Sequence, residues 1–217
     1  RRHTRSLCDW SSDVCSSDLA SATEAYDEPV FGRWHSSPAF DLVDGRYGLG
    51  YGPAGDSSAV DMSVTHQRRV VHVRDLACWV VSDVMACDTG QEHDFTQIWK
   101  FPPFRDANDG HDNPICGFTP EQVVFGDGSI RTMDVNGPNL WLYHFSGVPL
   151  VYGKHVGETD PYRGWHARFI GDLVPSVDMH ATWRTSGTSI VSTLMWPDRK
   201  STRLNSSHTV ISYAVFC

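Results

Sequence analysis

The amino-acid sequence predicts an all-β protein, an antiparallel β-sandwich made of stacked antiparallel sheets. Short segments in which apolar and polar residues alternate recur about every ten residues, as the strands of a sandwich do. Large aromatic residues occupy many of the apolar positions, and Gly, Pro and Asp separate the segments. Hardly any segment shows the 3.6-residue period of a helix, so layers of sheet must supply the core.

The first strands form a hairpin followed by a longer aromatic strand. Residues 61–73 (DMSVTHQRRVVHV) are rich in β-branched side chains, and residues 78–85 (CWVVSDVM) follow after a short connection. Residues 93–101 (HDFTQIWKF) form the next strand. One face of that strand carries Phe95, Gln97, Trp99 and Phe101, because side chains two positions apart point the same way.

The later strands form three further groups. Residues 121–135 contain Gly126-Asp127-Gly128 between two β-like runs, which predicts a hairpin. Residues 139–156 are apolar on both faces and predict a central strand pair, whereas residues 175–187 alternate and predict pairing with 188–197. The buried residues are expected to include Phe95, Trp99, Trp141, Phe145, Met179 and Trp183.

The two ends of the chain are related to each other through DNA. One choice of codons for Asp198–Cys217, taken as its reverse complement in another frame, translates as Arg1 to Asp18 without an error. The underlying element resembles a short-read sequencing adapter. We therefore expect residues 1–19 and 198–217 to be translated adapter sequence without native structure. Residues 20–197 are then expected to be a fragment of a longer gene product.

The composition of residues 20–197 excludes several function classes. This segment holds 12 basic and 22 acidic residues, so it lacks the clustered positive charge that a nucleic-acid partner requires. It has no apolar run of about 18 residues, which excludes a membrane-spanning helix. Its cysteines, Cys78, Cys87 and Cys116, are odd in number and lack CxxC spacing. They are expected to be ordinary thiols and not disulfides or zinc ligands.

Four basic residues on one strand are the first candidate group. His66, Arg68, His72 and Arg74 are spaced by even numbers of residues, so all four point to one face. This arrangement is either a cationic stripe that meets an acidic glycan or a solvated sheet face.

Two turn segments hold the other candidate residues. The segment with Tyr162, Arg163, Trp165 and His166 is bounded by Pro and Gly, and it either binds substrate or plugs the end of the sandwich. Arginine can donate two parallel hydrogen bonds to a uronate carboxylate, and an aromatic ring can stack on a sugar. The long irregular segment 102–120 carries acids and a histidine that are either cation ligands or solvated side chains. These are Asp106, Asp109, His111 and Asp112.

The order of these segments resembles a known family. "VTHQRRVVHVRDLACWVVSDVM", then "HDFTQIWKF", and later "PYRGWHARFIGDLVPSVDMHATWRTSGTSIVSTLMWP" are similar to the C-terminal sandwich of heparinase II/III-type polysaccharide lyases. The preceding "FDLVDGRYGLGYG" also resembles the segment before this sandwich core. The resemblance covers nearly all of residues 20–197.

The resemblance implies a chemistry and a location. Such lyases cleave uronic-acid polysaccharides by β-elimination: a base removes the proton next to the uronate carboxyl group, and the 4-linked sugar leaves. In that family the proton-transfer groups lie mainly on an N-terminal helical toroid, and a zinc is held by strands upstream of the matched region. The resemblance thus implies no cofactor in this fragment, zinc in the parent protein, and no catalysis by the fragment alone.

The resemblance also implies a partner and a compartment. The partner is an acidic polysaccharide or oligosaccharide, and the parent protein is expected to be periplasmic or secreted. A non-catalytic glycan-binding or structural β-sandwich module remains the alternative, because the same strand pattern serves both classes. The sequence upstream of residue 20 would distinguish the two.

Overall fold

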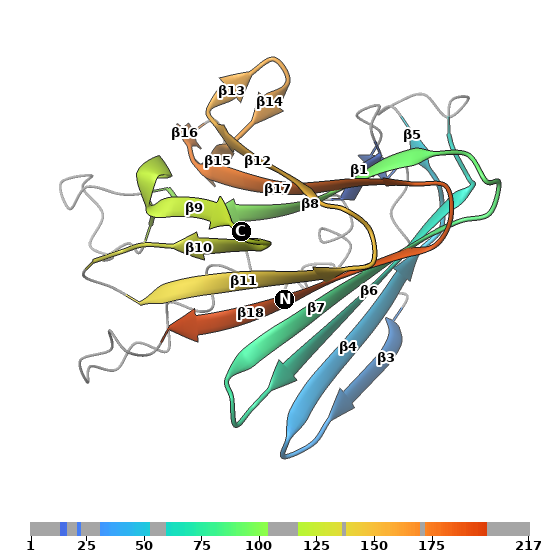
Figure 1. The fold of residues 1–217 in the computed structure, drawn as a ribbon, viewed down its shortest axis with the longest axis horizontal. Helices are drawn as coiled ribbons and strands as arrows, with labels where there is room; N and C mark the ends of the chain where they lie inside the picture. Colours follow the sequence, from blue (N-terminus) through green and yellow to red (C-terminus); the bar gives the residue numbers. More distant parts are fainter. Residues whose placement is uncertain are drawn as a thin grey trace. The chain divides into compact units, whose positions relative to one another are not determined.

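The computed structural model describes residues 14–16, 21–22, 31–52, 60–103, 117–135, 138–169 and 172–198. Apart from one 3-10 turn, η3 (Pro120–Gln122), the regular structure of these residues is β-strand (Figure 1). The predicted all-β class is confirmed. The strands are β1 (Val14–Ser16), β2 (Ser21–Ala22), β3 (Phe31–Ser36), β4 (Phe40–Tyr47), β5 (Tyr51–Gly52), β6 (Val64–Val73), β7 (Cys78–Cys87), β8 (His93–Phe101), β9 (Val123–Gly126), β10 (Ser129–Thr132), β11 (Asn139–Ser146), β12 (Val151–Val156), β13 (Glu158–Thr159), β14 (Tyr162–Arg163), β15 (Trp165–Phe169), β16 (Asp172–Pro175), β17 (Val177–Thr185) and β18 (Ser189–Asp198).

Two larger sheets contain most of the strands. The four-stranded sheet has the order β1-β8-β17-β12, and the eight-stranded sheet has the order β3-β4-β6-β7-β18-β11-β10-β9. Both predicted hairpins are confirmed as antiparallel pairs, β6 with β7 and β9 with β10. In the second hairpin Asp127 and Gly128 have φ angles of 50° and 72°. Positive φ at both turn residues matches the right-handed twist of the strands, and the sequence Asp-Gly favours it.

Two predicted pairings are wrong. β17 and β18 do not pair with each other: β17 lies between β8 and β12, and β18 lies between β7 and β11. β11 and β12 are likewise in different sheets, and β12 is an edge strand. In both cases consecutive strands cross from one sheet to the other, a connection that the alternation pattern cannot distinguish from a hairpin.

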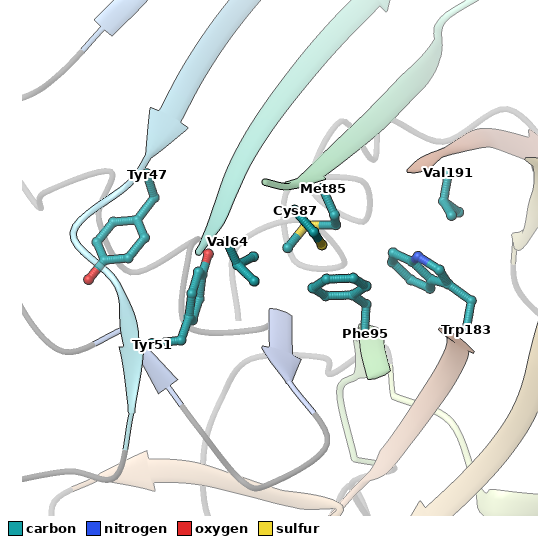
Figure 2. Packing of buried hydrophobic residues seen from close by; sticks show 8 residues of the cluster. All are labelled: Tyr47, Tyr51, Val64, Met85, Cys87, Phe95, Trp183 and Val191. Carbon is teal, nitrogen blue, oxygen red and sulfur yellow. The ribbon is translucent and has the colours of Figure 1, made fainter. Parts of the chain in front are cut away.

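The chain divides into two compact units. Unit 1 comprises Arg1–Gln97, Tyr143–Val151 and Thr182–Met195, and unit 2 comprises Ile98–Leu142, Tyr152–Ala181 and Trp196–Cys217. In unit 1, side chains from both larger sheets pack into one apolar cluster (Figure 2). The cluster consists of Tyr47, Tyr51, Val64, Met85, Cys87, Phe95, Trp183 and Val191. In unit 2 the buried apolar residues likewise come from both sheets, and they include Phe101, Val123, Ile130, Leu142, Val177, Met179 and Ala181.

Half of the predicted core residues are confirmed as buried. Phe95, Met179 and Trp183 are buried, and Trp99 and Trp141 are half-buried. Phe145 is 61% exposed, so its predicted burial is wrong. On β11 the even position Leu142 faces the core, and the odd positions therefore face outward despite their aromatic side chains.

Parts of the end segments fall inside the described residues. Val14–Ser16 pairs with β8, and Asp198 is the last residue of β18. The remainder of residues 1–19 and 198–217 lies outside the described residues. Main-chain hydrogen bonds at a free sheet edge can be made by almost any extended sequence, so β1 does not distinguish a native strand from an adapter-derived one. No helix in the described part of the chain is long and apolar enough to cross a membrane.

Candidate functional site

The four residues of the predicted turn site lie on or beside a small hairpin in unit 2. β13 pairs with β14 through Glu158 opposite Arg163 and Thr159 opposite Tyr162. We call residues 157–166 the turn hairpin. Tyr162 is 71% exposed, whereas Arg163, Trp165 and His166 are half-buried. His166 belongs to β15, opposite Val174 of β16.

Two glycines, Gly157 and Gly164, lie at the base of the turn hairpin and set its conformation. Gly157 has a φ of 60° and Gly164 a φ of 69°, a region that other residues adopt at a cost. A Cβ at Gly164 would also stand 2.6 Å from the carbonyl oxygen of His155. The carbonyl oxygen of Gly164 accepts hydrogen bonds from the amides of Gly157 and Ser176, each at 2.8 Å. The glycines therefore allow the main chain to close tightly at the base of the hairpin.

Hydrogen bonds and ring contacts of side chains also hold the turn hairpin together. The indole Nε1 of Trp165 donates to the carbonyl oxygen of Glu158 at 2.6 Å. The carboxylate of Glu158 lies 2.8 Å from Nδ1 of His155, and a carboxylate can only accept, so Nδ1 is the donor. The Tyr162 and Trp165 rings lie 6.3 Å apart. Trp165 thus fixes the hairpin, and Tyr162 provides the exposed ring.

A buried carboxylate anchors the turn hairpin to β17. Asp178 is 2% exposed, and its Oδ2 accepts hydrogen bonds from the amide of Gly164 at 2.8 Å and from Nζ of Lys100 at 3.0 Å. Its Oδ1 is buried and has no hydrogen-bond partner among the described residues. A buried carboxylate oxygen without a hydrogen bond destabilises the folded state. Oδ2 of Asp178 therefore anchors the hairpin, whereas Oδ1 contributes no such bond in the described part of the chain.

A buried histidine lies next to this anchor on the same face of β17. His180 is 7% exposed, and its Nε2 has no hydrogen-bond partner among the described residues. Its ring centroid lies 4.3 Å from that of His155. Burial lowers the pKa of His180 to about 4, and the nearby charges of His155 and Arg163 contribute in the same direction. His180 is therefore neutral near pH 7, and one of its ring nitrogens is available to a polar group.

The predicted basic stripe divides into two parts, and its inner part is buried. His66 is 3% exposed, and Arg68 is 17% exposed at its side chain. Both bind Asp83, which is 0% exposed: Nε2 of His66 lies 2.7 Å from Oδ1, and Arg68 donates to both carboxylate oxygens at 2.6 and 3.1 Å. Neither the cationic stripe nor the solvated face describes these two residues.

The Asp83 network extends to other strands of unit 1. Gln97 donates to Oδ2 of Asp83 at 2.6 Å, and the Gln97 oxygen accepts from Thr193 at 2.9 Å. Burial alone would raise the pKa of Asp83, but the charge of Arg68 and the hydrogen bond of His66 outweigh it and hold the pKa well below its usual range. Since donors saturate the carboxylate, its role is structural.

The outer part of the basic stripe is accessible. His72 is 30% exposed and Arg74 45% exposed at the side chain, and both lie close to Asp41. The His72 ring stacks on Trp79 with a centroid distance of 4.7 Å. These two residues, unlike His66 and Arg68, lie where a ligand has access to them.

The sequence analysis missed Lys100, His155, Glu158, Asp178 and His180. Asp178 and His180 occupy the polar positions of an alternating strand, the pattern of a solvent-facing side. The close pair Gly157 and Gly164 was the available signal, because it marks a tight main-chain approach.

Other candidates are not brought into a site. Asp106, Asp109, His111 and Asp112 lie outside the described residues, as does Cys116. Cys78 and Cys87 are buried free thiols. In the described ranges, no group of three or more His, Cys, Asp or Glu residues is arranged to hold a metal ion.

Comparison with known proteins identifies the fold through structures alone. No protein-family profile matches the sequence, and no curated protein does. Among solved structures, heparan sulfate lyase HepC from Pedobacter heparinus matches 84% of this chain at 11% identity with a TM-score of 0.56. A structure of heparinase III matches 86% at 15% identity, and the heparinase III product BT4657 matches 88% at 14% identity, both with a TM-score of 0.56.

The matches cover most of this chain but only a small part of each lyase. The chain corresponds to 24–25% of the length of the three lyases. At this level of identity the similarity concerns the fold, which is the fold of a β-sheet portion within polysaccharide lyases. The predicted resemblance is confirmed to that extent.

Proposed function

We propose that this chain is the β-sandwich portion of a polysaccharide lyase that cleaves uronic-acid-containing polysaccharide by β-elimination. The observation that carries the proposal is the fold shared with the heparan sulfate lyase and heparinase III structures over 84–88% of the chain. The motifs in the sequence that resemble the heparinase II/III sandwich support the same assignment independently.

The sandwich contributes glycan binding, and the proton transfer takes place elsewhere in the parent protein. Removing the weakly acidic proton next to a uronate carboxyl requires a base and donors that neutralise the carboxylate. In the lyase family that the sequence resembles, these groups lie mainly on an N-terminal helical toroid and not on the sandwich. The isolated chain is therefore inactive in elimination.

The turn hairpin is the part that contacts the acidic glycan. Tyr162 offers its exposed ring to a sugar face, and Arg163 donates to the uronate carboxylate. Trp165 keeps the hairpin closed through its bond to Glu158, and the half-buried His166 is the fourth residue of the proposed surface. An acidic ligand is favoured because it pairs with a guanidinium, whose positive charge does not depend on pH in the working range.

Binding of a defined oligosaccharide tests this proposal. The full chain is titrated calorimetrically with an oligosaccharide of alternating glucuronate and N-acetylglucosamine, and with the same oligosaccharide after reduction of its carboxyl groups. The acidic form should bind at least about tenfold more tightly, and Arg163→Ala should abolish that preference. Tyr162→Ala should weaken binding without lowering the melting temperature, whereas Trp165→Ala should lower both.

Lyase assays and the binding preference together decide the assignment. Ultraviolet absorbance of unsaturated uronate should stay flat with the isolated chain and rise when the parent's additional sequence is present. Equal binding of both oligosaccharides, or elimination by the isolated chain, would overturn the proposed division of labour. Binding by a parent protein that produces no unsaturated ends would favour a non-catalytic glycan-binding module.

A further inference from the structure

The guanidinium of Arg163 has no acidic partner among the described residues. It is half-buried, and no described residue forms a hydrogen bond or an ion pair with it. In unit 1, by contrast, arginines pair with aspartates: Arg68 with Asp83, Arg69 with Asp44, Arg74 with Asp41 and Arg184 with Asp94. A partly desolvated cation without a counter-ion is suited to receive an anion from a ligand.

An acidic residue nevertheless faces Arg163 across the turn hairpin. Glu158 of β13 lies directly opposite Arg163 of β14 in the antiparallel pairing. Side chains at such positions lie about 5 Å apart at Cβ, and opposite charges there attract each other. The register alone therefore predicts an ion pair between Glu158 and Arg163, which would neutralise the positive charge of the candidate site.

His155 binds the Glu158 carboxylate in place of Arg163. Nδ1 of His155 lies 2.8 and 3.0 Å from the two carboxylate oxygens. The main chain of Glu158 is also fixed, because its carbonyl oxygen accepts the hydrogen bond from the Trp165 indole. Both the main chain and the side chain of Glu158 are thus engaged by groups other than Arg163.

Two contacts fix the ring of His155. Its centroid lies 4.3 Å from that of His180, which is buried on the neighbouring strand β17. Gly153 lies two residues earlier on β12 and so on the same face, and a Cβ at Gly153 would stand 3.1 Å from Nε2 of His155. The ring therefore lies against the bare main chain of Gly153. These contacts hold Nδ1 toward Glu158 before any ligand binds.

We propose that His155 is a positioning residue that binds the Glu158 carboxylate and thereby keeps the Arg163 guanidinium free for an acidic ligand. This inference rests on the proposed function and names the residue that gives the turn hairpin its preference for a carboxylate. Without the His155 bond, Glu158 pairs with Arg163, and a uronate carboxylate must displace Glu158 before it can bind. The contact of a sugar face with Tyr162 involves no such competition. His155 therefore controls selectivity for charge.

The test compares two ligands on the full chain and on a variant that lacks the His155 donor. His155→Phe keeps an aromatic ring beside His180 and removes Nδ1. The ligands are the oligosaccharide of alternating glucuronate and N-acetylglucosamine and its carboxyl-reduced form. Affinity for the acidic form should fall about fivefold, the upper range for competition by a partly exposed ion pair, and affinity for the reduced form should stay the same.

A second substitution should restore the acidic preference. In the double variant His155→Phe with Glu158→Gln, the neutral amide does not compete for Arg163, so affinity for the acidic oligosaccharide should recover to within about twofold. A residue that only supports the fold would not be rescued by a change at Glu158. Loss of affinity that the double variant does not restore would overturn the inference.

Lys154 provides a matched control for the general field of charges. It precedes His155 on β12, and its Nζ donates to the carbonyl oxygens of Pro120 and Val123. Lys154→Met removes a full positive charge next to His155 but leaves the His155–Glu158 bond in place. The acidic preference should therefore persist in this variant. A loss as large as that of His155→Phe would mean that charge in general, and not Glu158, sets the preference.

The NMR signal of the Arg163 Nε–Hε group without ligand separates this inference from the proposed function. The signal should shift in His155→Phe and return in the double variant. Glu158→Gln alone should leave it in place, because Glu158 binds His155 in the unchanged chain; this variant alters only a partly exposed side chain, so it keeps the test valid if His155→Phe unfolds.

The outcomes then differ for the two proposals. An unchanged Arg163 signal in folded His155→Phe, or a shifted signal in Glu158→Gln alone, would overturn the role of His155. The expected signals without binding of the acidic oligosaccharide by any variant would overturn the proposed function alone.

Discussion

Two buried carboxylates, Asp83 in unit 1 and Asp178 in unit 2, have opposite surroundings. Both oxygens of Asp83 accept hydrogen bonds, from Arg68, His66 and Gln97. Asp178 is nearly as buried, yet one oxygen binds two donors and the other binds none among the described residues. The first carboxylate joins strands, and the second supports an exposed hairpin. Asp83, whose two oxygens both have hydrogen-bond donors, has a structural role. Asp178, which has described donors for one oxygen only, lies beside the candidate site.

Removing the satisfied carboxylate should have the largest effect. Asp83→Ala removes the carboxylate that binds the half-buried guanidinium of Arg68 and the buried His66, and we expect a loss of about 3 kcal/mol in the free energy of unfolding. Urea denaturation measures it. Arg184→Ala breaks an exposed ion pair with Asp94, which solvent screens, and should therefore cost far less. Similar losses for both variants would contradict the structural role of Asp83.

The next effect concerns the base of the turn hairpin. Gly164→Ala introduces both a positive-φ penalty and a clash with the main chain of His155, and we expect a loss of about 3 kcal/mol. Gly90 has a similar φ of 72° but no atom within 4 Å of an added Cβ. Gly90→Ala therefore isolates the φ term and should cost about 1 kcal/mol. Equal costs would mean that the close approach at Gly164 is relaxed in solution.

The pattern of the sequence predicts the sheets but not how consecutive strands are distributed between them. Alternation in residues 177–184 identifies β17 and its inward face, because Met179 and Trp183 must be buried. It cannot show that the turn hairpin covers the opposite face, which buries Asp178 and His180 as well. The hairpin residues 162–166 were predictable from their Gly and Pro boundaries. Their buried support depends on contacts distant in sequence, which local patterns do not encode.

The titration of His180 gives a smaller, pH-dependent effect. Its pKa is about 4 in the folded chain and 6.5 in the unfolded chain, so the unfolded state binds a proton first as the pH falls. The stability that neutral His180 provides is complete above pH 6.5 and decreases between pH 6.5 and about 4. Lowering the pH from 6.5 to about 5 should cost about 1.5 kcal/mol through this residue. His180→Gln should flatten that part of the profile, and an unchanged profile would contradict the burial of a neutral ring.

The smallest effect should come from the ends of the chain. Deleting residues 1–19 and 199–217 removes the main-chain pairing of Val14–Ser16 with β8 but no residue of the apolar cluster of unit 1. If these ends are translated adapter sequence, the loss should stay below about 0.5 kcal/mol in thermal and urea unfolding. A loss of several kcal/mol would show that the ends are native parts of the fold.

The most direct test of the central claim compares the two carboxylate regions in one titration. Backbone and side-chain NMR signals of the full chain are recorded while an oligosaccharide of alternating glucuronate and N-acetylglucosamine is added. We predict the largest shifts at Tyr162, Arg163 and the amide of Gly164, with none at His66 or Arg68 around Asp83. Shifts centred on His66 and Arg68, with an unperturbed turn hairpin, would contradict the account.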